Sequence, residues 1–107
     1  MSHELKLVVS IVAKEKSDKV IEAIEKAGAI KSTIMLGRGR SKNNPKLFFG
    51  MQIEPMREVI FTLVPKDKAE TIFEVVMKEG NLDKPLNGVV FILDLEKVGG
   101  IDLSMLE

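Results

Sequence analysis

Residues 8–30 read VVSIVAKEKSDKVIEAIEKAGAI, and residues 60–82 read IFTLVPKDKAETIFEVVMKEGNL. The two stretches align from end to end without a gap, and glycines stand at matching positions, Gly28 and Gly80. Each copy opens with an alternating, β-branched run and continues with apolar residues at helical spacing. Solenoid repeats need about three copies, so two copies predict one domain with internal pseudo-twofold symmetry.

Each copy therefore predicts a strand and then a helix, and a further apolar strand follows each helix, at 31–37 and at 88–95. The order βαββαβ with right-handed crossovers predicts an α+β fold. We expect the ferredoxin-like split-βαβ sandwich, with both helices on one face of the sheet. Gly28 and Gly80 stand where a left-handed helix C-cap belongs, and Ser17 is a candidate N-cap.

Composition excludes several classes of function. The 107 residues predict a single domain, 1–107, and 16 basic side chains balance 16 acidic ones, which argues against nucleic-acid coating and anionic membranes. Without cysteine, and with His3 as its one histidine, the chain lacks the residues of thiol catalysis and multi-histidine metal sites. No apolar run reaches the roughly 18 residues of a spanning helix, and the N-terminus lacks a signal-peptide pattern. We expect a cytoplasmic protein without catalytic residues, metal or membrane insertion.

Both faces of the predicted strands carry apolar residues, although the helices can cover only one. We assign the helices to the face that carries Phe61 and Phe91. We expect the other face to be buried against neighbouring subunits, because an open apolar patch of that size usually marks an interface. The alternative is that the loop and tail of the same chain cover this second face. Its residues are Val8, Val12, Ile60, Val64, Val90 and Ile92.

A long loop, from Arg38 to Pro55, connects strands two and three. Loops of this length in small domains are usually functional or disordered. Five cations and one anion lie between Gly37 and Arg57, in a chain of zero net charge. Glycine allows close backbone approach, and arginine beside backbone N–H groups suits phosphate or carboxylate. Two interpretations stay open: an anion site at the loop base, and a flexible, solvated basic loop.

Three motifs, in this order, resemble the PII signalling family: GRGRS at 37–41, TLVPKDKAETI at 62–72 and NGVVFILDLEKV at 87–98. The resemblance covers nearly the whole chain. It implies a non-enzymatic homotrimer that binds an adenine nucleotide (ATP, ADP or AMP) in clefts between subunits. It also implies that the loop from Lys42 to Ile53 regulates a partner, a membrane transporter or a metabolic enzyme. From the balanced charge, we expect no nucleic acid among the partners.

The resemblance also implies which residues form the cleft. They come from the loop base, from the turn before the last strand and from strand positions beside the adenine. Arg57 matches a basic position that faces the phosphates or a 2-oxoglutarate carboxylate. The full set is Ile11, Gly37, Arg38, Gly39, Arg40, Ser41, Arg57, Leu63, Val64, Asn87, Gly88 and Val89.

The chain departs from the family pattern at positions that contact phosphate and 2-oxoglutarate. Ser41 stands in place of a glutamine, Val89 in place of a lysine, and a pair of arginines beyond the last strand is missing around Gly99. The chain has no tyrosine, so tyrosyl uridylylation is excluded. These departures favour a nucleotide with fewer phosphates, or another small anion, over ATP with 2-oxoglutarate.

Two other functions share this topology. An RNA-binding module needs aromatic side chains on the exposed sheet face. Our assignment of Phe61 and Phe91 to the covered face, together with the zero net charge, disfavours that function. An acylphosphatase-like enzyme needs an anion-binding loop with an arginine after the first strand, but residues 13–16 read Ala-Lys-Glu-Lys.

Overall fold

The structure is a computed structural model that describes residues 4–38, 46–48, 51–53, 56–84 and 87–101. A one-turn 3₁₀ segment precedes each α-helix: η1 (Lys14–Lys16) precedes α1 (Ser17–Lys26), and η2 (Lys66–Lys68) precedes α2 (Ala69–Glu79). Within the described residues, neither helix is long and apolar enough to cross a membrane. The strands and helices are β1 (Leu5–Ala13), α1 (Ser17–Lys26), β2 (Lys31–Arg38), β3 (Lys46–Phe48), β4 (Met51–Ile53), β5 (Met56–Pro65), α2 (Ala69–Glu79) and β6 (Gly88–Asp94).

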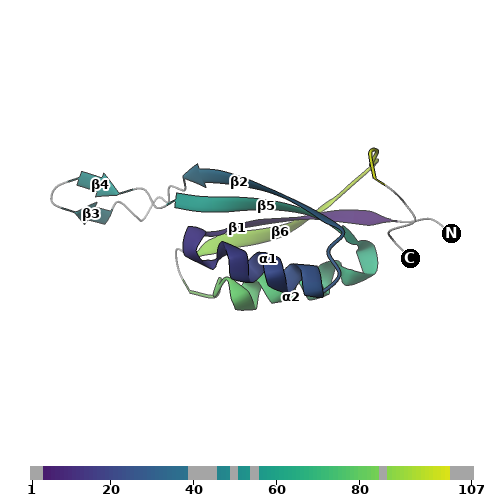
Figure 1. Cartoon of the computed structure of the whole chain (residues 1–107), viewed down its shortest axis with the longest axis horizontal. Coiled ribbons are helices and arrows are strands. Elements are labelled where there is room, and N and C mark those ends of the chain that lie inside the picture. Colours follow the sequence, from purple (N-terminus) through teal and green to yellow (C-terminus); the bar gives the residue numbers. More distant parts are fainter. Residues whose placement is uncertain (1–3, 39–45, 49–50, 54–55, 85–86, 102–107) are drawn as a thin grey trace.

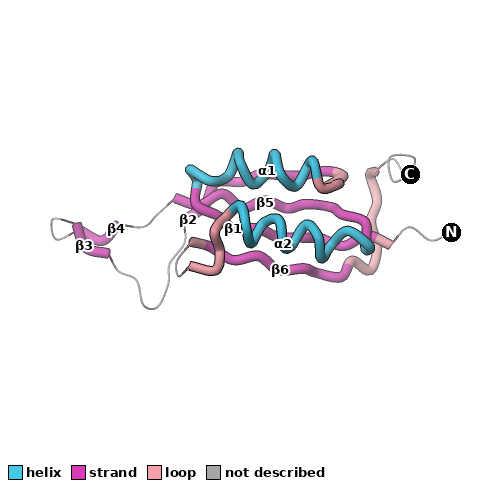
Figure 2. The backbone as a smooth tube through the Cα atoms, turned by 90° about the horizontal axis from the view of Figure 1, so that it is seen from below, coloured by secondary structure: helices cyan, strands magenta, loops and turns pink. Residues whose placement is uncertain are grey.

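Four of the strands form one antiparallel sheet in the order β2-β5-β1-β6. Both helices lie on the same face of this sheet (Figures 1 and 2). The first repeat contributes the central strand β1 and the edge strand β2, and the second contributes the central strand β5 and the edge strand β6. The predicted ferredoxin-like α+β fold is therefore confirmed, with the two copies of the repeat interleaved across the sheet.

The hydrophobic core lies between the sheet and the two helices. Its strand residues include Val8 and Ile60, which have no exposed surface. The helices contribute the apolar stripes that their 3.6-residue spacing predicts. All of the following residues are fully buried in this core: Val8, Val12, Ile60 and Val64 from the strands, Val20 and Ile24 from α1, and Ile72 and Val76 from α2.

Our assignment of the sheet faces was wrong. The six residues that we expected at a subunit interface lie beneath the helices instead, and Phe61 and Phe91 lie on the opposite, open face. The six are Val8, Val12, Ile60, Val64, Val90 and Ile92. Alternation shows that a strand has two apolar faces but does not identify the one that a helix covers. The polar residues Ser10 and Thr62 lie on the helix-covered face and are fully buried.

The open face is apolar across three rows of paired residues. Leu7 pairs with Leu63 and Leu93, Val9 with Phe61 and Phe91, and Ile11 with Val59 and Val89. Residues directly opposite one another in an antiparallel pair point to the same face, so each row forms a continuous apolar strip. The strip residues of β6 are exposed by 52% (Val89), 40% (Phe91) and 45% (Leu93).

The long loop contains a hairpin that the sequence analysis did not predict. Strand β3 pairs antiparallel with β4, so that Lys46 is opposite Ile53 and Phe48 is opposite Met51. The hairpin stands apart from the four-stranded sheet, beyond the end where β2 finishes and β5 begins (Figure 1). Strands of three residues are too short to show a recognisable alternation.

The helix ends differ in part from the prediction. Gly28 has a positive φ of 109°, as expected just past the end of α1. Gly80 is right-handed with φ −82°, and the next residue, Asn81, takes the left-handed conformation with φ 56°. Asparagine tolerates this conformation better than most residues, which explains the shift by one position. Ser17 does not cap α1, because the side chain of Ser17 makes a different bond, described below.

Candidate functional site

The base of the long loop meets the turn before β6 at one end of the sheet. Arg57, at the start of β5, pairs with Gly37 on β2 and with Ala13 on β1. Val12 pairs with Gly88 on the other side of β1, so Ala13 is next to Asn87 in the same row. The fold therefore brings together the loop base and the turn, as the sequence analysis expected.

Arg57 links these two segments directly. Its Nη1 donates a hydrogen bond to the main-chain carbonyl oxygen of Asn87, at 3.1 Å. The side-chain amide of Asn87 in turn donates to the carbonyl oxygen of Asn81, at 2.8 Å. Hydrogen bonds from a charged donor are among the stronger ones in proteins. One chain of contacts therefore runs from β5 through the turn to the end of α2.

Gly88 fixes the path of the turn as it enters β6. Its φ is 140°, and a Cβ at this position would lie 2.0 Å from the carbonyl oxygen of Ile11. Glycine is required here on both counts, because other residues neither adopt this φ readily nor fit against the backbone of β1. Residues Asn87 to Val89 are thus held close to the end of β1.

A second contact anchors the start of β5 on the helix-covered face. The hydroxyl of Ser17 donates to a carboxylate oxygen of Glu58. Ser17 is 1% exposed and is the first residue of α1, where a negative charge is favourable because of the helix dipole. The sequence analysis missed Glu58, although a carboxylate within the apolar run of β5 was a signal that could have identified it. It also missed Ala13 and Asn81.

The other predicted site residues are placed unequally. Arg38 is exposed at the end of β2, and Ile11 is half-buried on the open face beside Val89. Leu63 shares this face but is four residues further along the sheet than the Ile11 row, or about 13 Å. Val64 has no exposed surface and packs under the helices, so the structure excludes its side chain from a cleft on the open face.

Three predicted residues, Gly39, Arg40 and Ser41, lie outside the described residues. The same holds for the first part of the loop segment that we expect to contact a partner, from Lys42 to Ile53. Their assignment to the site stays a prediction. Among the described residues, the positive charges at the loop base come from Arg38 and Arg57.

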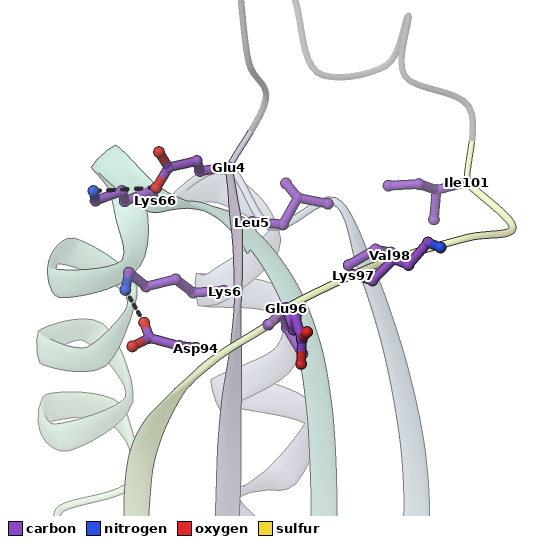
Figure 3. A pocket seen from close by; sticks show the side chains of 10 residues that line it. Glu4, Leu5, Lys6, Lys66, Asp94, Glu96, Lys97, Val98 and Ile101 are labelled. Atoms are coloured by element: carbon purple, nitrogen blue, oxygen red, sulfur yellow. Dashed lines mark hydrogen bonds and ion pairs between the residues drawn. The ribbon is translucent and has the colours of Figure 1, made fainter.

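A hollow of about 640 Å³ lies at the opposite end of the sheet, between β1, β6 and the segment that follows β6 (Figure 3). Its apolar part is formed by Leu5, Leu95, Val98 and Ile101. Its charged side chains are Glu4, Lys6, Lys66, Asp94, Glu96 and Lys97.

The charges of this hollow largely neutralise one another. Lys66 Nζ lies 3.1 Å from Glu4 Oε2, and Lys6 forms an ion pair with Asp94. Lys6 also donates a hydrogen bond to the Asp94 carboxylate, and this bond, together with the positive charge of Lys6, holds the pKa of Asp94 below its ordinary value. With three lysines and three carboxylates, the hollow offers no net charge to attract an anion. The loop base, with its two arginines, is therefore the better candidate.

A sequence model of the family described as Nitrogen regulatory protein P-II matches residues 5–103. The match begins at β1 and extends past β6, so it includes both copies of the repeat, the long loop and the turn at Asn87.

Proposed function

The chain belongs to the nitrogen regulatory protein P-II family, and on this basis we propose that it is a non-enzymatic signal-transduction protein that binds an adenine nucleotide between subunits of a homotrimer. Membership supports the regulatory role directly. We further propose that the loop carries the signal to a membrane transporter or a metabolic enzyme, and that the protein works in the cytoplasm.

One observation supports the proposed location of the nucleotide site. The loop base and the turn at Asn87 to Val89, which are far apart in the sequence, meet at one end of the sheet around Arg57. The backbone N–H groups of a glycine-containing turn are suitable for binding phosphate, and Arg57 holds this turn at the loop base. Gly37, Arg38, Gly39, Arg40 and Ser41 would complete the anion-binding side of the site.

The open face of the sheet supports the trimer. Three apolar rows cross β5, β1 and β6, and their outer members on β6 are about half exposed. Burying apolar surface contributes about 25 cal/mol per Å², so this face favours association with other copies. Within one chain Leu63 lies apart from Ile11, so we propose that Leu63 contributes to the site of a neighbouring copy across this interface.

The residues around the turn favour a nucleotide with few phosphates. Val89 is 52% exposed where related proteins are expected to carry a lysine, so this wall of the site is apolar. Ile11 and Val59 continue the apolar surface in the same row. An adenine ring can pack against this apolar wall. The few arginines of the site can neutralise one or two phosphates rather than three.

Calorimetric titration with ATP, ADP, AMP and cyclic dinucleotides tests the proposal. We expect at least one adenine nucleotide to bind, and no binding at millimolar concentration would refute the proposed site. Arg40→Ala should weaken binding by roughly 1.5–3 kcal/mol through loss of a charge-assisted hydrogen bond. Lys42→Ala is the matched control and should cost much less, because a lysine offers a point charge in place of the planar, bidentate fork of an arginine.

RNA binding is the second candidate, and the corrected sheet faces favour it more than the sequence analysis did. Phe61 and Phe91 flank Val9 on the open face, and Phe91 is 40% exposed. Aromatic residues on this face of a βαββαβ sheet can stack on bases. The zero net charge argues in the other direction. Salt-sensitive retention of single-stranded RNA in a filter-binding assay would support this function over the first.

A further inference from the structure

We propose that Arg57 is a positioning residue of the nucleotide site, because it bridges across β1 and holds the turn at Asn87–Gly88 against the loop base. The inference rests on the proposed nucleotide site but concerns how that site is held together. It assigns to Arg57 a role distinct from a direct contact with phosphate.

The register of the sheet leaves room for this bridge. Arg57 lies on the open face between Gly37 and Ala13, whose side chains are the smallest available. Ala13 is followed in the same row by Asn87, just ahead of the Val12–Gly88 pair. Strands are about 4.8 Å apart, so the bridge spans about 10 Å from β5 to the turn. Arginine has the longest cationic side chain, and its guanidinium reaches the Asn87 carbonyl at 3.1 Å.

The bridged carbonyl belongs to the residue that closes the turn. The side chain of Asn87 bonds back to Asn81, whose own left-handed conformation starts the turn after α2. On the C-terminal side of Asn87, the backbone of Gly88 packs directly against the carbonyl of Ile11. Between these two constraints, the orientation of the Asn87 peptide depends on Arg57. The Asn87 carbonyl belongs to the same peptide unit as the N–H of Gly88, so a side chain on β5 sets the direction of the N–H that would face the phosphate.

The bridge also ties the turn to the long loop, since Arg57 is the second residue of β5 and the loop returns to the sheet at Met56. Its neighbour Glu58 is fixed to Ser17 on the opposite face. The first residues of β5 are thus bonded to the turn on one face and to α1 on the other. A change in the turn would act on the loop through one side chain.

Two substitutions separate positioning from direct contact with ligand. Arg57→Met removes the donor and the charge. Ala13→Val keeps every charge but places a branched side chain beneath the bridge. Lys78→Met, on the exposed surface of α2, is the control for the loss of one charge. Circular dichroism and thermal unfolding establish that each variant folds.

Backbone amide exchange at residues 87–90 and calorimetric titration with ADP at two salt concentrations are then measured for all four proteins. We expect faster exchange in both Arg57→Met and Ala13→Val, and a loss of ADP affinity of roughly tenfold or more in each. Ala13→Val should keep the salt dependence of the parent, because its charges are unchanged. Lys78→Met should match the parent in both measurements.

Normal exchange and normal ADP affinity in Ala13→Val, with weak binding only in Arg57→Met, would overturn the proposal in favour of a direct phosphate contact. Unchanged exchange in both variants would also overturn it. If the parent itself fails to bind ADP, the proposed function loses its support, but the exchange measurement still decides whether Arg57 holds the turn.

Discussion

Gly88 offers the sharpest test of the site geometry, through the substitution Gly88→Ala. The added Cβ would lie 2.0 Å from the Ile11 carbonyl oxygen, and the backbone would keep a φ of 140°. A positive φ costs a non-glycine residue about 1–2 kcal/mol. Relieving the contact requires β6 to move away from β1, which sacrifices one or two ladder hydrogen bonds at about 1 kcal/mol each. We therefore expect Gly88→Ala to lower the free energy of unfolding by about 2–4 kcal/mol.

Two other glycines separate the contributions. Gly100 has a φ of 84°, but a Cβ at this position would have no other atom within 4 Å. Gly99 lies outside the left-handed region, and a Cβ there would also have no atom within 4 Å. Gly100→Ala should cost about 1 kcal/mol from its φ alone, and Gly99→Ala should change stability by less than about 0.5 kcal/mol. Urea unfolding at one fixed protein concentration measures all three, because association also affects stability. Equal effects of Gly88→Ala and Gly100→Ala would refute the close approach to Ile11.

Three further predictions concern the core, the open face and the far end of the sheet. The hydroxyl of Ser10 is buried with no hydrogen-bond partner among the described residues, so Ser10→Ala should raise the free energy of unfolding by about 1 kcal/mol, and a loss of stability in urea would contradict this. Phe91→Asp places a charge on the open face, so sedimentation should show a smaller, folded species than the trimer proposed for the parent; an unchanged sedimentation coefficient would exclude that face from the interface. The pKa of Asp94 is lowered by Lys6, so the pair stabilises the fold at pH values above the ordinary carboxyl pKa, and this contribution is lost as the pH falls through the lowered value. Asp94→Asn should therefore be slightly less stable than the parent at neutral pH and equally stable in acid. Thermal unfolding of both proteins across the pH range would show this.

The repeat in the sequence was enough to predict the main architecture. Residues 8–30 and 60–82 each specify a strand and a helix by two different apolar periods, and matching glycines mark the ends of the helices. Right-handed crossovers then leave few topologies, and the observed strand order is the expected one. The convergence of the loop base with the turn at Asn87 followed from the family resemblance and agrees with the register.

The side of the sheet that the helices cover could not be read from the strands. Val8 and Val9 are neighbours on opposite faces and are both buried, because open-face residues shield one another. Alternation is symmetric with respect to the two faces, so it does not identify the face that the helices cover. The bridge from Arg57 to Asn87 was also out of reach, since it depends on a register between segments 30 residues apart.

The interleaving of the two repeats has a consequence for how the chain folds. Strands β1 and β2 are not neighbours in the sheet, and each instead pairs with β5. During synthesis, the first repeat therefore has no strand partner of its own, and sheet formation waits until residues 56–65 have left the ribosome. Pairing between such distant segments slows folding, because the entropy of closing a large loop is lost before contacts form. A single βαβ unit of this kind would leave its two strands unpaired, and the strands of a second copy of the same unit could pair with them.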